Sequence, residues 1–140
     1  MIKQLMVFVD NKPGRLEKIT ATLSKESINI RSILITDNGQ FGIVKLLVDK
    51  PDQANIFLSK EGFATAVKDV IAVHVDDSPG KLHELIKVLS AKNINIADGY
   101  GFASHSFFCI EAEENNRQDI EKLIKEKGFK IISGAEFYAS

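Results

Sequence analysis

A seven-residue segment that is suited to binding a small anion occurs twice in this chain. The copies span residues 10–16, with the sequence DNKPGRL, and residues 76–82, with the sequence DDSPGKL. Proline is favoured at the first position of a helix, and glycine, which has no side chain, lets a ligand or another backbone come close. The unpaired N–H groups at such a helix start suit a carboxylate or a phosphate. For one copy alone, an ordinary strand-to-helix turn is the simpler interpretation.

The two segments belong to a repeat that covers most of the chain. When the sequence is shifted by 66 residues against itself, without gaps, identical residues meet at Val7, Val9, Asp10, Pro13, Gly14, Leu16, Leu23, Ser24, Ile28, Asn29, Ile30, Phe41, Gly62 and Phe63. This period exceeds the roughly 20–50 residues of solenoid repeats, so we expect two small domains, residues 1–70 and 71–140. No linker rich in glycine, proline or serine separates them, and one apolar run, residues 70–75, joins the two copies.

The first copy begins with the pattern of a strand, a helix and a hairpin. Residues 5–9 alternate as a strand does. Residues 28–36 are rich in β-branched side chains and are followed, after Asp-Asn-Gly, by residues 41–48. Because Asn-Gly tolerates positive φ, these two stretches predict a hairpin. The helix between the first strand and the hairpin is indicated by helical spacing in Leu16, Ile19, Thr20 and Leu23.

A second helix and a last strand complete each copy. Pro51 begins this helix in the first copy, and Gly62 and Gly128 end it in the first and second copies. Each copy therefore has the order strand-helix-strand-strand-helix-strand. That order predicts an α+β fold, an α/β sandwich of two tandem ferredoxin-like domains, each an antiparallel sheet with both helices on one face.

Composition and charge exclude several classes of protein. The 140 residues are 44% hydrophobic and 26% charged, which is typical of a soluble globular protein. A net charge of −1 gives no electrostatic attraction for a polyanion, so we expect no nucleic acid partner. We expect a cytoplasmic protein without a membrane partner, because the sequence shows no signal peptide and no apolar stretch of about 20 residues.

No set of residues has the spacing of a catalytic or metal-binding site. His74, His83 and His105 form no His-x-x-x-His pair, and the single cysteine, Cys109, excludes an internal disulfide and a multi-cysteine metal site. No phosphate-binding loop, nucleophile elbow or paired catalytic carboxylate is present. We therefore expect no enzyme activity, no metal and no cofactor, with Cys109 as a buried or half-buried strand residue.

The element order, the Asp-x-x-Pro-Gly-x-Leu turn and the Ile-Asn-Ile after the first helix together resemble an ACT domain, occurring twice. The resemblance covers both copies, which is essentially the whole chain. It implies a small regulatory module that binds amino acids, similar to the stand-alone tandem ACT proteins that sense or carry a small ligand. A catalytic domain, which such modules usually control, is not present in this sequence.

The resemblance also implies where the ligand would bind. In the family the ligand lies where two ACT domains meet side by side, between the turn before the first helix of one domain and the start of the second strand of its neighbour. Backbone N–H groups near the turn glycine would hold the carboxylate, and an asparagine side chain can bridge ammonium and carboxylate. The positions carried over are Asn11, Pro13, Gly14, Asp77, Pro79 and Gly80 in the turns, and Asn29, Ile30, Asn95 and Ile96 in the strands.

Two features of this implied site leave alternatives open. Asp77 stands where the first copy has Asn11, and a carboxylate there would repel the ligand carboxylate and attract its ammonium, so the two sites need not be equivalent. Asn29 and Asn95 could instead be turn residues at the end of a helix. The sequence leaves open whether the paired domains belong to one chain or to two.

An apolar open sheet face offers two further interpretations. RNA-recognition domains share this element order and carry aromatic residues on that face, but this chain is slightly acidic and has no basic stripe. Such an apolar patch usually marks a protein–protein interface. We therefore expect this face to pack against a second copy of the chain, in a homodimer, or against an enzyme of amino acid metabolism that the protein regulates in trans. The alternative function is a ligand-free module that only dimerises or docks on a partner enzyme. The side chains expected on this face are Met6, Phe8, Phe41, Ile43 and Leu47.

Overall fold

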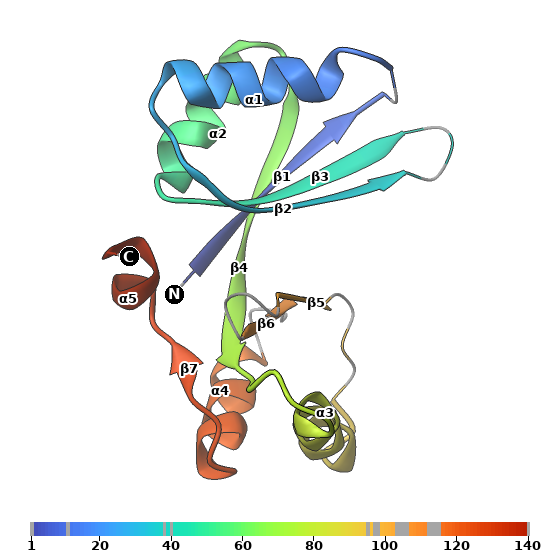
Figure 1. Cartoon of the computed structure of the whole chain (residues 1–140), viewed down its shortest axis with the longest axis vertical. Coiled ribbons are helices and arrows are strands. Elements are labelled where there is room, and N and C mark those ends of the chain that lie inside the picture. Colours follow the sequence, from blue (N-terminus) through green and yellow to red (C-terminus); the bar gives the residue numbers. More distant parts are fainter. Residues whose placement is uncertain are drawn as a thin grey trace. The chain divides into compact units, whose positions relative to one another are not determined.

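The chain forms two compact units (Figure 1). The computed structural model describes residues 2–10, 12–37, 39, 41–94, 96, 99–102, 107–111 and 116–139. Residues 3–68 form the first unit, and residues 69–140 together with residues 1–2 form the second. Both units are built of antiparallel strands and helices in the predicted ferredoxin-like order, which confirms the α+β fold class.

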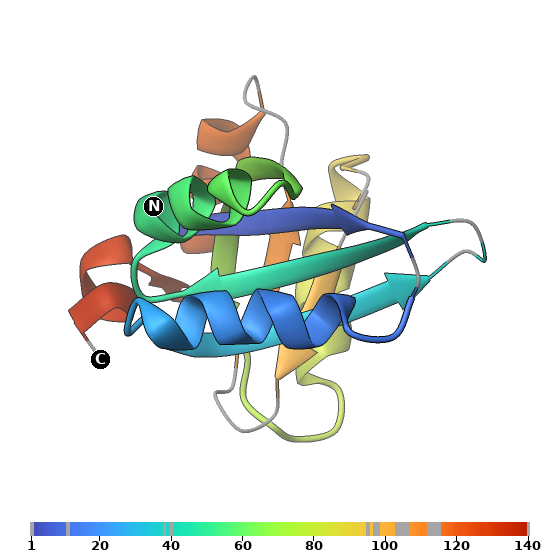
Figure 2. The same cartoon turned by 90° about the horizontal axis from the view of Figure 1, so that it is seen from above.

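In the first unit the helices lie on one face of the sheet, as Figure 2 shows from above. Its strands lie in the order β2-β3-β1-β4. The pairs β1–β3 and β2–β3 are antiparallel, with Leu5 and Ile33 both opposite Leu46. The elements are β1 (Ile2–Val9), α1 (Arg15–Lys25), β2 (Ile30–Asp37), β3 (Gly42–Val48), α2 (Pro51–Lys60) and β4 (Ala64–His74).

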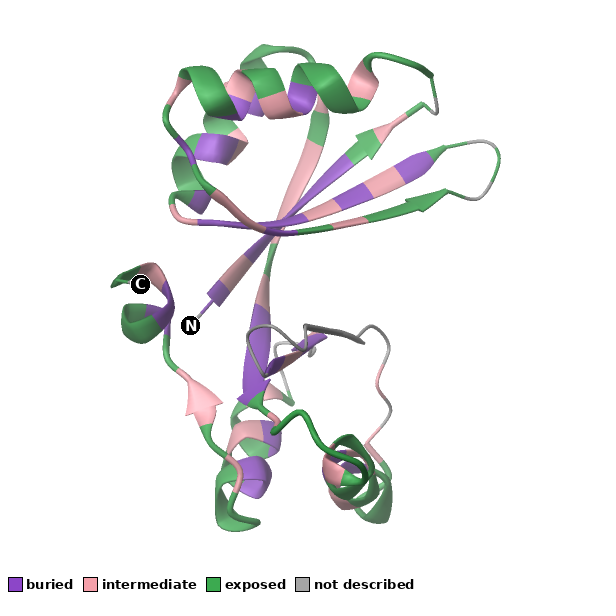
Figure 3. Ribbon diagram, viewed as in Figure 1, coloured by how far each residue is buried: buried purple, intermediate pink, exposed green. Residues whose placement is uncertain are grey.

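The core of the first unit lies between the sheet and the helices (Figure 3). Alternate strand residues such as Val7 and Val44 pack with Ile19 and Leu23 of α1, so the strand and helix periodicities of the sequence are confirmed here. Leu16 was expected on the same helix face but lies in the first turn of α1, where its side chain is 39% exposed. The apolar stripe of α1 therefore begins one turn later than the sequence pattern indicates.

The second unit begins with the last part of β4, which is one uninterrupted strand across the repeat boundary. Strand β6 pairs antiparallel with β4 and β5, and the short β7 pairs with β4. Ile71, Leu85, Leu89 and Ile124 are among the side chains that form its core. The elements after β4 are α3 (Lys81–Ala91), β5 (Gly99–Phe102), β6 (Phe107–Glu111), α4 (Arg117–Glu126), β7 (Ile131–Ile132) and α5 (Gly134–Ala139).

The C-terminal end of the second unit differs from the prediction. The expected last strand is only the two-residue β7, and the helix α5 follows it. The Ser133 hydroxyl accepts a hydrogen bond from the Glu136 backbone N–H at 3.1 Å, and Phe137 is buried. Serine followed three residues later by glutamate is the sequence pattern of a capping box. This signal in residues 133–136 would have predicted the helix.

The open face of the first unit is less exposed than the sequence suggested. Phe8 and Phe41 are exposed and Ile43 is half-buried, whereas Met6 and Leu47 are buried. The predicted apolar patch is therefore smaller than expected, with Phe8 and Phe41 as its exposed members.

Helices α1 to α4 each end with a residue in the left-handed conformation directly after the C-cap. Gly62 and Gly128 have φ of 91° and 88°, as predicted for the residue that follows a helix C-cap. Ser27 and Asn93 take the same place after α1 and α3, with φ of 56° and 57°. The Ser27 N–H donates to the Ser24 carbonyl at 3.1 Å, and the Ile28 N–H donates to the Leu23 carbonyl at 2.9 Å. A residue with a Cβ therefore sits where glycine is favoured.

Ser27→Gly is expected to stabilise the protein by about 0.5–1 kcal/mol. A left-handed backbone costs a residue with a Cβ roughly 1–2 kcal/mol, and the greater chain entropy of glycine offsets about 0.5–1 kcal/mol of that gain. Urea denaturation followed by circular dichroism measures the difference. The control is Ser24→Gly inside α1, which should destabilise by about 0.5 kcal/mol. A Ser27→Gly protein no more stable than the wild type would contradict the expectation.

Candidate functional site

The turn before α1 is built by a short series of backbone hydrogen bonds. The Lys12 N–H donates to the Asp10 carbonyl at 2.9 Å, and the Arg15 N–H donates to the Lys12 carbonyl at 3.3 Å. Gly14 caps the helix with φ 90° and ψ −14°, and its carbonyl accepts from the Lys18 N–H at 3.0 Å. Pro13 and Gly14 are both exposed, so this helix start faces solvent.

The turn before α3 has the same conformation. The Ser78 N–H donates to the Asp76 carbonyl at 2.9 Å, and the Lys81 N–H donates to the Ser78 carbonyl at 3.3 Å. Gly80 caps α3 with φ 87° and ψ −11°, and accepts from Glu84 at 3.0 Å. Asp77, Pro79 and Gly80 are exposed. The repeated motif therefore encodes one local structure twice.

The roles of proline and glycine in the turn differ from those expected. Each helix begins after the glycine, at Arg15 or Lys81, so proline precedes the N-cap and is not the first helical residue. A Cβ added at Gly14 or Gly80 would meet no atom within 4 Å. Positive φ therefore accounts for the glycines without any close approach inside a unit, and another residue there would be strained by roughly 1–2 kcal/mol.

Charged side chains surround the first turn. The Asp10 carboxylate lies 3.0 Å from Arg15 Nε and 3.3 Å from Lys12 Nζ. The hydrogen bond from Lys12, together with Arg15, holds the pKa of the Asp10 carboxyl below its usual value. In the second turn, Asp76 Oδ1 lies 3.1 Å from His74 Nε2.

The predicted strand residues lie at the other end of the helix. The Asn29 N–H donates to Asp49 Oδ1 at 3.0 Å, and the Asp49 N–H donates to the Asn29 carbonyl at 3.1 Å. The Asn29 residue is exposed and Ile30 is half-buried. Helix α1 has 11 residues and is therefore about 16 Å long at 1.5 Å per residue. Within one unit, the turn and the strand residues consequently do not meet.

The other predicted positions lie partly outside the described structure. Asn11 and Asn95 fall outside the described residues, as does His105. Ile96 is half-buried. Cys109 is buried in β6, as expected.

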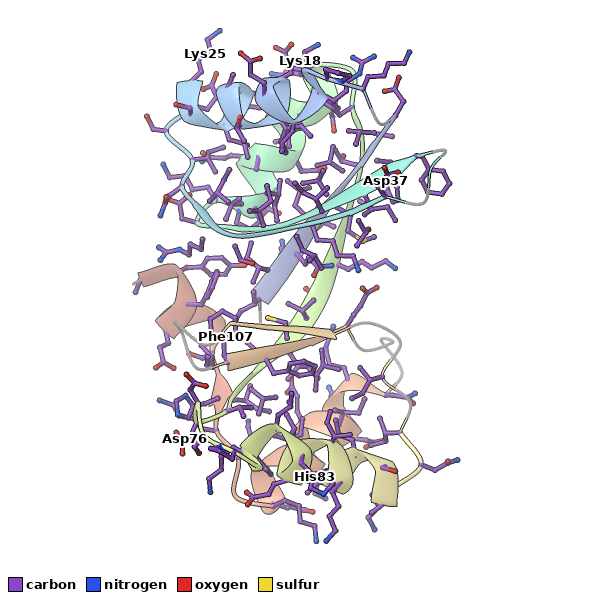
Figure 4. All side chains as sticks on the ribbon, turned by 45° about the vertical axis from the view of Figure 1, so that its right-hand side comes forward. Lys18, Lys25, Asp37, Asp76, His83 and Phe107 are labelled. Atoms are coloured by element: carbon purple, nitrogen blue, oxygen red, sulfur yellow. The ribbon has the colours of Figure 1, made fainter. Side chains whose placement is uncertain are left out.

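A cleft that the sequence did not reveal lies inside the first unit. Its volume is about 150 Å³. It lies between the turn before α1 and the turn that joins α2 to β4, and Figure 4 labels one of its residues, Lys18, on α1. The lining consists of Phe8, Val9, Asp10, Arg15, Lys18, Glu61, Gly62 and Phe63. No short motif signals this cleft, because its two turns are far apart in sequence.

Neither a metal site nor a membrane-spanning helix is found among the described residues. In the described part of the chain, no three histidine, cysteine, aspartate or glutamate residues cluster as metal ligands would. None of the helices among the described residues has the length and apolar character needed to cross a bilayer.

The comparisons with known proteins identify the family. A family model described as an ACT domain pair matches residues 1–136. The chain therefore belongs to the ACT domain pair family, which confirms the resemblance drawn from the repeated turn. ACT domains are regulatory modules and not catalytic ones.

Several solved structures are similar to this chain. Protein BT0572 from Bacteroides thetaiotaomicron is 32% identical, with a TM-score of 0.89 over 99% of this chain and 96% of that one. The ligand-free regulatory subunit of aspartate kinase from Thermus thermophilus is 12% identical, with a TM-score of 0.67 over 91% and 93%. The corresponding subunit from Thermus flavus is 13% identical, with a TM-score of 0.61 over 89% and 91%. The last two show the fold alone. The comparison with curated proteins finds no match.

Proposed function

We propose that this protein is a regulatory module that binds a free amino acid at the turns before α1 and α3. The observation that carries this proposal is the doubled turn. Both copies share one pattern of backbone hydrogen bonds and a left-handed glycine cap, and both leave an exposed helix start. Such a helix start favours a carboxylate. Membership of the ACT domain pair family supports the amino acid as the ligand.

Each site is proposed to be shared between neighbouring ACT domains. The turn and the second strand of one unit lie at opposite ends of a helix about 16 Å long. A single amino acid cannot contact both, so the second strand must come from another domain of the same chain or of a second chain. In this arrangement Asn11 and Gly14 share one ligand with Asn95 and Ile96. Asp77 and Gly80 share the other with Asn29 and Ile30.

A homodimer is the proposed assembly. Ile33 and Ile35 on β2, the edge strand of the first unit, are 39% and 51% exposed. Exposed apolar side chains beside a free strand edge are a common place for pairing with another chain. The same observation supports the alternative function, a ligand-free module that dimerises or docks on an enzyme of amino acid metabolism. Aspartate kinase regulatory subunits share the fold, and a cytoplasmic enzyme regulated in trans is the proposed target class.

Selective stabilisation by an amino acid tests the proposed function. A ligand present at 100 times its Kd adds about 2.7 kcal/mol to the free energy of unfolding. At roughly 2–8 °C per kcal/mol, this raises Tm by several degrees. We expect at least one of the twenty standard amino acids to do so in a thermal-shift screen. If none raises Tm, the alternative of a ligand-free interaction module takes its place.

A further inference from the structure

The cleft of the first unit contains two ion pairs, one at the start of α1 and one that joins α1 to the turn between α2 and β4. On the turn before α1, Arg15 Nε lies 3.0 Å from the Asp10 carboxylate. On the opposite side, Lys18 Nζ lies 3.8 Å from Glu61 Oε2 and donates to the Glu61 backbone carbonyl at 3.3 Å. Each cation is matched by one carboxylate, so the cleft has both signs of charge and no net charge.

The shape and the apolar parts of the cleft limit what it can hold. A volume of about 150 Å³ is below the roughly 300–1,000 Å³ of pockets for drug-sized ligands. Phe8 and Phe63 also line the cleft, and Lys18 Nζ lies 5.6 Å from the centre of the Phe63 ring. A molecule of a few heavy atoms with one positive and one negative group matches this combination of size and charge.

The second copy does not reproduce the cleft chemistry. Shifting by 66 residues places Glu84 at the position of Lys18, Lys127 at that of Glu61, and His74 at that of Phe8. Glu84 pairs instead with Lys81 on its own helix at 3.8 Å. The two charges that join α1 to the α2–β4 turn in the first unit are therefore reversed at the equivalent positions of the second.

We propose that the cleft of the first unit is an additional binding site for a small zwitterion, such as an amino acid with a small side chain. The ligand carboxylate would lie between Arg15 and Lys18, and its ammonium between Asp10 and Glu61. Arg15 has five N–H donors, which allows it to keep Asp10 while it binds a second carboxylate. The site takes its residues from one unit alone, so it requires neither Asn29 nor Asn95. This inference rests on the proposed function for the class of ligand.

The test is titration of the full chain with glycine, L-alanine and L-serine, followed by calorimetry and by NMR of the backbone amides. The expected result is saturable binding that shifts the amides of Gly62 and Phe63. Lys18→Met and Glu61→Gln should each weaken this binding about tenfold or more, since each removes a hydrogen bond to a charged group. The matched controls at the equivalent positions, Glu84→Gln and Lys127→Met, should change Kd by less than about twofold.

Titrations with two singly charged molecules test whether the cleft requires both charges of the ligand. Acetate and methylamine each carry one of the two charges and should bind at least about tenfold more weakly than glycine, because each leaves one half of the cleft unmatched. If acetate binds as tightly as glycine, the proposal that the cleft selects a zwitterion is wrong. If an amino acid binds and neither Lys18→Met nor Glu61→Gln changes its Kd, the cleft is not the binding site. The proposed function would still stand. Failure of all twenty to bind would overturn both.

Discussion

A chain that ends at residue 70 is expected to be unfolded or aggregated. The cut would divide β4 (Ala64–His74) and remove Ile71–His74, a segment that pairs with β6, from the rest of the strand. It would also separate residues 1–2, at the start of β1, from the unit to which they belong. A domain of about 60 residues buries only about 60% of its unfolded surface and is marginal alone.

Thermal unfolding of the fragment 1–70 checks this expectation against the full chain. The full chain should show a cooperative transition by circular dichroism, and the fragment should show none. A soluble, monomeric fragment with a cooperative transition would show that the first copy folds by itself. The repeat boundary at residues 70 and 71 would then also be a boundary of folding.

Leu23→Ala and Leu89→Ala are each expected to destabilise the protein by about 2–5 kcal/mol. The two leucines occupy equivalent positions of the repeat and are fully buried in the cores of the first and second units. Removing a buried leucine side chain loses its transfer free energy and leaves a cavity. Because β4 belongs to both units, we expect each variant to lower one common unfolding transition.

Urea denaturation of the two variants measures how much stability each one loses. It also shows whether the two units unfold in one common transition. Leu16→Ala and Leu82→Ala are the matched controls, since these side chains are 39% and 44% exposed, and they should change stability by within about 0.5 kcal/mol. Two separate transitions, of which each variant lowers only one, would contradict the dependence of the units on each other.

The element order could be predicted because local signals carry it. The helix ends at Gly62 and Gly128 follow from the need for positive φ, and the buried pair Ile19 and Leu23 follows from helical spacing. Helix α5 was not predicted because the apolar stretch after Gly128 also fits a strand, whereas the Ser-x-x-Glu cap favours a helix. The exposure of Leu16 was not predicted because the spacing of apolar residues in a helix does not show which turns pack against the core.

The candidate site was predicted only as far as it lies in one stretch of sequence. The turn was found because its residues are contiguous and occur twice, although the geometric reason for its glycine, positive φ, is visible only in the backbone. The cleft could not be found in this way. Its bridging pair, Lys18 and Glu61, is separated by 43 residues and is brought together by the packing of α1 beside the α2–β4 turn.

Binding of an amino acid by the full-length chain is the most direct test of the central claim. The measurement is titration calorimetry with each of the twenty standard amino acids, beginning with those that raise Tm. The account predicts saturable heat with a submillimolar Kd for at least one of them, and a much weaker response for its amide, which lacks the carboxylate that the turns are proposed to hold. No saturable heat from any amino acid, with a folded protein confirmed by circular dichroism, would contradict the account.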